Sequence, residues 1–154
     1  RSEEERPEPP GEESEEEEEG LLPNDGLNVG LLPSAASLSA DAQRQLLVLT
    51  YGRVAVRAAP QAERHFCVDH KKIRYRLSGR EAAKVSGLDE LVQARLCRCA
   101  HFPTWMAEVV REIESADLQR VAIFCWKGRH RSVAAAELLQ AVYYPLAIVQ
   151  HLSL

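Results

Sequence analysis

The sequence predicts a single α/β domain with a mainly parallel sheet flanked by helices. Short apolar runs that look like buried strands alternate with amphipathic stretches that look like helices. One of these runs, 121–125, leads through a short basic turn into an alanine-rich helix. With 154 residues, of which 45% are hydrophobic, the chain is long enough for one domain with an apolar core.

The beginning of the chain differs in composition from the rest. Residues 1–19 contain eleven Glu and no aliphatic or aromatic side chain, so we expect an acidic, disordered tail. Without this segment the formal net charge of −4 becomes +5, from 12 acidic and 17 basic residues in 20–154. We assign 1–38 to the tail and a linker, and 39–154 to the domain. The tail is interpreted as a solubilising segment; the alternative is competition with polyanions for the basic domain.

The first elements of the domain are expected soon after this boundary. Ser39 or Asp41 can cap a short helix, and 46–50 is typical of a buried strand. An extended piece is predicted over 54–57, and a second strand over 65–68.

Three helices are predicted in the middle of the chain. Ser78 followed by Glu81 is a capping-box pattern for a short helix that ends near Gly87. A second helix is expected over 88–96, and a third begins at Pro103, a residue favoured in the first helical turn. The third helix places five apolar residues on one face: Trp105, Met106, Val109, Val110 and Ile113.

A basic loop over 125–132 is the main functional candidate. It joins the predicted strand 121–125 to a predicted helix over 132–142, and 148–152 is predicted as a last strand. A helix start presents unpaired backbone N–H groups that favour an anion. The predicted ligand-binding residues are Lys127, Gly128, Arg129, His130, Arg131 and Ser132. Phosphate is the natural ligand for such a set; the alternative is a solvated turn in which Arg131 pairs with Glu137 or Asp117.

The basic loop and several upstream residues resemble the C-terminal domain family of the RNase adapter protein RapZ. The matching loop residues are Cys125, Gly128, His130, Arg131, Ser132 and Val133, followed by Ala136-Glu137. Further matches are Tyr51-Gly52, Asp69 with Lys71, Ser86-Gly87-Leu88-Asp89 with Val92, and His151. The resemblance covers roughly 46–154.

The resemblance implies a binding module rather than an enzyme. Members of the family bind an amino-sugar phosphate and structured RNA through this domain. Carried over to this chain, Gly128, His130 and Arg131 would contact a phosphate, with Ser132 at the helix start. A P-loop pattern is missing from the sequence, so neither ATPase nor kinase activity is expected.

A second interpretation of the basic loop is catalytic. The spacing Cys125-x5-Arg131-Ser132 is also that of cysteine-dependent phosphatases, in which a thiolate is the nucleophile. Phe124 stands where those enzymes usually have His, and the general acid would have to be Asp89 or Asp117. The alternative is that Cys125 is a small buried residue at a strand end.

RNA contact is a further prediction, from basic residues before the Ser78 helix. The candidates are Lys71, Lys72, Arg74 and Arg76, with support from Arg95 and Arg98. In an extended segment, Lys72, Arg74 and Arg76 lie on one face and could follow a phosphate backbone. Tyr75 could stack on an unpaired base. The alternative is an exposed strand kept soluble by its charge.

No metal or other cofactor is predicted. Cys67-x2-His70 and Cys97-x-Cys99-x-His101 are the only spacings that resemble zinc ligands, and a buried Cys67 with a mixed exposed turn over 97–101 explains them better. Four Cys in this arrangement do not form a secreted disulfide framework, and no apolar run approaches the ~20 residues of a membrane span. We therefore expect a soluble cytoplasmic protein that does not bind membranes, with a phosphorylated small molecule as partner; the sequence does not indicate an oligomeric state.

Overall fold

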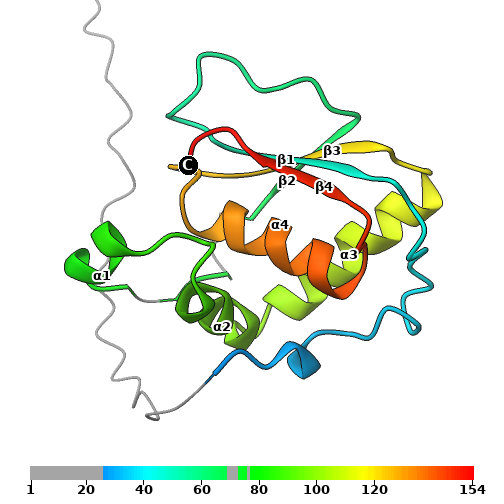
Figure 1. The fold of residues 1–154 in the computed structure, drawn as a ribbon, viewed down its shortest axis with the longest axis horizontal. Helices are drawn as coiled ribbons and strands as arrows, with labels where there is room; N and C mark the ends of the chain where they lie inside the picture. The colour runs from blue at the N-terminus through cyan, green and yellow to red at the C-terminus, as the bar shows by residue number, and fades with distance from the viewer. Residues whose placement is uncertain (1–25, 69–72, 76) are drawn as a thin grey trace, which may run out of the picture.

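The fold is a four-stranded parallel sheet with its helices on one side (Figure 1). The computed structural model describes residues 26–68, 73–75 and 77–154. The strands are β1 (Leu47–Gly52), β2 (Arg64–Cys67), β3 (Arg120–Cys125) and β4 (Ile148–His151). Their order is β2-β3-β1-β4, and every pair is parallel. The predicted α/β class with a parallel sheet is confirmed.

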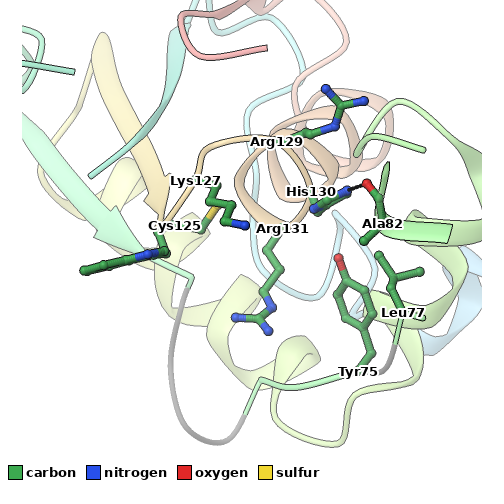
Figure 2. Close-up of a pocket in the computed structure, with 9 residues that line it drawn as sticks. Tyr75, Leu77, Ala82, Cys125, Lys127, Arg129, His130 and Arg131 are labelled. Atoms are coloured by element: carbon green, nitrogen blue, oxygen red, sulfur yellow. Dashed lines mark hydrogen bonds between the residues drawn. The ribbon is translucent and has the colours of Figure 1, made fainter. Parts of the chain in front are cut away.

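The four described α-helices begin within two residues of their predicted starts: α1 (Gly79–Lys84), α2 (Glu90–Arg98), α3 (Phe102–Ser115) and α4 (Arg131–Val142). The short 3-10 helix η1 (Val29–Leu31) lies in the segment expected to be a linker. Ser78 and Glu81 form the expected capping box, in which each side chain accepts a hydrogen bond from the other residue's backbone N–H. Each described helix is too short or too polar to cross a membrane. The turn between β3 and α4 forms the pocket drawn in Figure 2.

The two faces of the sheet are covered differently. Because side chains alternate along a strand, Val48, Val121 and Ile123 point to one face, where they join the core formed with α2, α3 and α4. Leu49, Tyr51 and Ala122 point to the other face and form a smaller cluster. The segment 53–63 between β1 and β2 covers this second cluster (Figure 1). Helices therefore shield only one side of the sheet.

The edge strand β4 is fastened by a short chain of polar contacts. His151 Nε2 lies 2.7 Å from a carboxylate oxygen of Glu137 on α4, and its Nδ1 lies 2.8 Å from the hydroxyl of Thr50 on β1. Since a carboxylate only accepts, Nε2 carries the proton that is donated to Glu137. This connection holds the last strand against both its neighbouring strand and α4.

Two local predictions from the first half of the chain are wrong. Neither Ser39 nor Asp41 starts a helix; Ser39 has a φ of 53°, and the Asp41 carboxylate accepts a hydrogen bond from the N–H of Gln43 at 2.9 Å. That side-chain bond stabilises a turn in place of the first helical turn. The predicted extended piece at 54–57 is also a turn, closed by a hydrogen bond from the N–H of Ala55 to the carbonyl of Gly52.

The apolar core extends before Ser39, the residue at which we expected the packed domain to begin. Leu32 and Leu38 are buried in the main core, and the hydroxyl of Tyr143 donates a 2.6 Å hydrogen bond to the carbonyl of Pro33. The described part of the predicted linker is thus packed against the domain. The acidic segment 1–19 lies outside the described residues.

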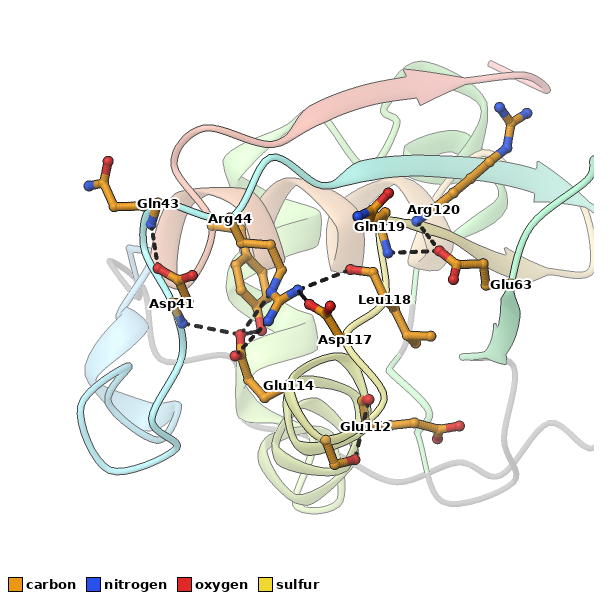
Figure 3. Close-up of polar contacts among 12 residues, drawn as sticks. Asp41, Gln43, Arg44, Glu63, Glu112, Glu114, Asp117, Leu118, Gln119 and Arg120 are labelled. Carbon is orange, nitrogen blue, oxygen red and sulfur yellow. Dashed lines mark hydrogen bonds and ion pairs between the residues drawn. The ribbon is translucent and has the colours of Figure 1, made fainter.

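A charged cluster ties this N-terminal segment to α3 near the start of β1 (Figure 3). Arg44 forms ion pairs with Glu114 at 3.0 Å and with Asp117 at 2.6 Å. Tyr144 donates its hydroxyl proton to Glu114 at 2.7 Å, and the N–H of Asp41 donates to the same carboxylate at 3.1 Å. Burial acts to raise the pKa of Glu114, but these hydrogen bonds, with Arg44 first, outweigh burial and hold that pKa below its ordinary value.

Glu114→Gln should destabilise the protein by about 2 kcal/mol at neutral pH, since it leaves the partly buried Arg44 with a weaker partner. The lowered pKa means that the Glu114 carboxylate stabilises the fold above the ordinary Glu value of 4.5, and that this stabilisation is lost as the pH falls through the folded-state pKa. Urea unfolding at several pH values should therefore show the difference from wild type shrinking below pH 4.5. Glu108→Gln, at an exposed position on the same helix, is the control and should change little.

Candidate anion-binding site

A pocket of about 260 Å³ opens between the basic loop and the segment that precedes and forms α1 (Figure 2). Its position at the carboxyl end of β3 is where ligands bind in open α/β sheets. The lining residues are Cys125, Trp126, Lys127, Arg129, His130 and Arg131 on the loop side, and Tyr75, Leu77 and Ala82 opposite. The predicted ligand-binding residues Lys127, Arg129, His130 and Arg131 thus line the pocket, whereas Gly128 in the turn and Ser132 in the first turn of α4 do not.

Close backbone contacts fix the shape of the loop. Gly128 has a φ of 73°, and a Cβ at this position would overlap the backbone of Gly52 at the end of β1. On the other side of the loop, a Cβ on Gly87 would overlap the carbonyl of His130 and the N–H of Ala134. The N–H of Gly87 also donates a 2.9 Å hydrogen bond to the carbonyl of Arg129. The loop is therefore held between β1 and the turn before α2.

His130 braces the loop against the end of α1. Its Nε2 lies 2.9 Å from the carbonyl oxygens of both Ala82 and Val85. Because both oxygens can only accept, Nε2 is the protonated nitrogen and donates to them. The sequence predicts that His130 donates to a phosphate, but in the structure its Nε2 proton is donated to backbone carbonyls of the protein. Arg129 adds a 3.3 Å hydrogen bond from Nε to the carbonyl of Val85.

Two cationic side chains lie at the cavity. Figure 2 shows Lys127 and Arg131 beside it, whereas the guanidinium of Arg129 is turned to the other side of the loop. The Arg131 guanidinium carbon lies 5.6 Å from the ring centre of Tyr75, a cation-π contact. The residues described as lining the pocket include no Asp and no Glu, so its side-chain charge is positive.

The carboxylates that offered an alternative role for Arg131 are engaged elsewhere. Glu137 accepts from His151, and Asp117 pairs with Arg44 near the opposite end of β3. Asp89 accepts a 2.7 Å hydrogen bond from the N–H of Ser86 and does not line the pocket. The structure therefore brings neither candidate general acid, Asp89 or Asp117, into the cavity.

Cys125 lies at the junction of β3 and the loop with its sulfur inside the turn. The N–H of Gly128 donates to Sγ at 3.2 Å, and the Ser132 hydroxyl oxygen lies 3.2 Å from the same sulfur. Cys125 is 6% exposed and Ser132 is fully buried. Ser132 thus contacts the cysteine instead of lining the cavity. Phe124, which stands in the place of a phosphatase His, points to the other face of the sheet and stacks on Tyr51.

The RNA-binding candidates are described only in part. Lys71, Lys72 and Arg76 lie outside the described residues, as do Asp69 and His70. Arg74 is exposed, and its carbonyl accepts a 3.0 Å hydrogen bond from the thiol of Cys99. RNA contact by this segment stays a prediction.

Three other residues from the RNA-binding hypothesis have contacts within the protein. Arg95 pairs with Glu81 at 3.1 Å, and Arg98 donates to the carbonyl of Gly26 at 3.0 Å. Tyr75, which we expected to stack on a base, is only partly exposed and faces Arg131. Its ring packs against the main core, and that packing removes one face from solvent.

The cysteines suit packing better than metal binding. The exposed turn expected over 97–101 is wrong for both cysteines: Cys97 lies in α2, and Cys97 and Cys99 are buried, whereas His101 is exposed. Burial raises the pKa of the Cys97 thiol to about 11, against the thiolate form that a metal requires. Within 26–68, 73–75 and 77–154, no three His, Cys, Asp or Glu side chains are grouped closely enough to hold a metal ion.

No family model and no curated protein matches this chain. The resemblance to the RapZ C-terminal family stays a prediction, and function has to be inferred from the pocket. The sequence does not predict that Tyr75, Leu77 and Ala82 form the wall of the pocket opposite the basic loop. Tyr75 and Leu77 stand directly before the Ser78 cap, and that short spacing was the available signal.

Gly128→Ala should destabilise the protein by at least about 2 kcal/mol, because it combines a positive φ with overlap against the backbone of Gly52. Gly79→Ala is the matched control: a Cβ there would have no atom within 4 Å, and alanine favours the helix by less than about 1 kcal/mol. Chemical unfolding of both variants measures the difference. Equal stability of the two would contradict the close packing at Gly128.

Proposed function

We propose that this protein binds a phosphorylated small molecule, with the phosphate seated against the basic loop. The observation that carries the proposal is the convergence of Lys127 and Arg131 on one cavity that has no acidic residue in its described lining. A cavity whose charged lining is cationic favours an anionic ligand. This proposal concerns binding, not catalysis.

The chemistry of the site fits a phosphate better than a simple halide or carboxylate. Arg131 is the first residue of α4, a helix of 12 residues, so the dipole and the first N–H groups of α4 add to its charge. A guanidinium can hold two phosphate oxygens at once, and Lys127 adds a point charge. The cavity of about 260 Å³ has room beyond the phosphate for a small polar group. A sugar phosphate, the ligand class implied by the resemblance, is the first candidate.

Arg131→Ala in the full chain should weaken binding of inorganic phosphate and of an amino-sugar phosphate by at least tenfold, because charged hydrogen bonds contribute about 1.5–3 kcal/mol each. Isothermal titration calorimetry gives the dissociation constants. Arg111→Ala removes an exposed arginine from α3 and should leave both constants unchanged. Equal affinity in Arg131→Ala and Arg111→Ala would exclude Arg131 as the phosphate ligand. Short RNA in the same series tests whether the basic surface also binds nucleic acid.

A cysteine-dependent phosphatase is the second candidate, and the environment of Cys125 favours it. The N–H of Gly128 points to Sγ, Ser132 Oγ lies at 3.2 Å, and the sulfur is close to the start of α4. These contacts hold Cys125 in the lining of the pocket, where a bound phosphate group could meet its sulfur. In the reaction, the thiolate would attack phosphorus and displace an aryl oxide, and water would then hydrolyse the phosphocysteine to inorganic phosphate. An electron-poor aryl oxide such as p-nitrophenolate is stable enough as an anion to leave without a general acid, so its release does not depend on Asp89 or Asp117.

Cys125→Ser tests the phosphatase candidate with p-nitrophenyl phosphate as the substrate. If Cys125 is the nucleophile, release of p-nitrophenolate should fall to background, while phosphate affinity stays within a few fold of wild type. Cys67→Ser, on β2 and away from the pocket lining, should keep full turnover. If Cys125→Ser keeps its turnover, Cys125 is not the nucleophile, and phosphate binding is left as the proposed function.

A further inference from the structure

Tyr75 has a buried hydroxyl group without a hydrogen-bond partner. Its Oη is inaccessible to solvent and is bonded to nothing in the part of the chain that the structure describes. The same residue lines the pocket opposite the basic loop, and Figure 2 shows its hydroxyl directed toward the space between His130 and Arg131. A buried polar atom at the wall of a cavity is one that a ligand can satisfy.

An unsatisfied buried hydroxyl is unfavourable for a protein, and native structures contain few of them. The tyrosine ring cannot turn away easily, because one side packs against the core and the other faces the guanidinium of Arg131 at 5.6 Å. Phenylalanine would make the same ring contacts without the cost of the hydroxyl. The hydroxyl therefore does not contribute to the stability of the unliganded protein.

Tyr75 is available as a hydrogen-bond donor because its phenol stays un-ionised. Burial raises the pKa of the phenol well above its ordinary value of 10.0, and the nearby Arg131 opposes this shift only in part. At neutral pH the group thus keeps its proton. The protonated phenol can therefore donate its hydrogen to an acceptor such as a phosphate oxygen.

We propose that Tyr75 is a ligand-binding residue whose hydroxyl donates a hydrogen bond to an oxygen of the phosphate held by Arg131. This inference rests on the proposed function, and it adds a contact from the wall of the pocket that faces the basic loop. The cation-π contact places the guanidinium and the phenol next to each other, so both can reach one phosphate group. Tyr75 and Arg131 then hold the phosphate from two separate segments of the chain.

Tyr75→Phe is expected to affect the stability of the unliganded protein and its affinity for phosphate in different ways. Tyr75→Phe removes an unsatisfied group from the unliganded protein, so its melting temperature should stay the same or rise. The same change removes a donor to a charged oxygen, so the dissociation constant for inorganic phosphate should increase about tenfold or more. A residue with a purely structural role would not produce this pair of effects.

The matched control is Tyr143→Phe. Tyr143 is fully buried, and its hydroxyl donates a 2.6 Å hydrogen bond to the carbonyl of Pro33, far from the pocket lining. Its loss should lower the melting temperature and leave phosphate affinity unchanged. The two variants remove the same atom from two tyrosines and are expected to differ in both measurements.

The experiment uses the full chain, with differential scanning fluorimetry and calorimetric titration of inorganic phosphate on wild type, Tyr75→Phe, Tyr143→Phe and Arg131→Ala. Phosphate affinity that is unchanged in Tyr75→Phe but lost in Arg131→Ala overturns the role of Tyr75 and leaves the proposed function standing. A lower melting temperature in Tyr75→Phe also overturns it, since the hydroxyl would then have a partner in the free protein. Absence of phosphate binding in wild type overturns the proposed function itself, and the role of Tyr75 with it.

Discussion

The contact between Gly128 and Gly52 is the constraint on which the candidate site depends. Backbone meets backbone there, with no room for a Cβ on either residue. This contact fixes the position of the basic loop against the end of β1. On the other side of the loop, Gly87 packs against the backbone of His130 and Ala134. With the backbone fixed, His130 can reach the end of α1 and Arg131 can begin α4 over the ring of Tyr75. The placement of the charged groups therefore follows from the packing of three small residues.

The two ends of the sheet have different electrostatic properties. Near the start of β1, Arg44 is matched by Glu114 and Asp117, and the charges of this cluster satisfy one another. At the carboxyl end of β3, Lys127 and Arg131 adjoin a cavity whose described lining contains no carboxylate. A cavity whose described charged lining is cationic favours an anionic ligand. The same parallel sheet therefore supports a stabilising cluster at one end and the candidate site at the other.

Most of the fold was predictable because its signals are local. The apolar run 121–125, the Ser78 and Glu81 capping box and Pro103 each specify an element through nearby residues. The predicted helix near Asp41 was wrong because the side chain bonds within a turn, an outcome that composition does not distinguish from a cap. The basic loop was found as a cluster of donors. The pocket wall at Tyr75 and the hydrogen bonds of His130 to the end of α1 were not predicted, because they depend on contacts between distant segments. Val85 and His130 are 45 residues apart in the sequence, and Tyr75 and Arg131 are 56 apart.

The strand order has a consequence for how the chain folds. The central strand β1 pairs only with β3 and β4, so Leu47 meets Arg120 and Ile148, partners 73 and 101 residues later in the sequence. Such non-local pairing slows folding, because a long loop must close before the contacts form. During synthesis, β1 leaves the ribosome before β3 and β4, so its apolar residues stay without partner strands until those later segments have been made. This interval is when the chain is most exposed to aggregation, and when a chaperone would contribute most to its yield.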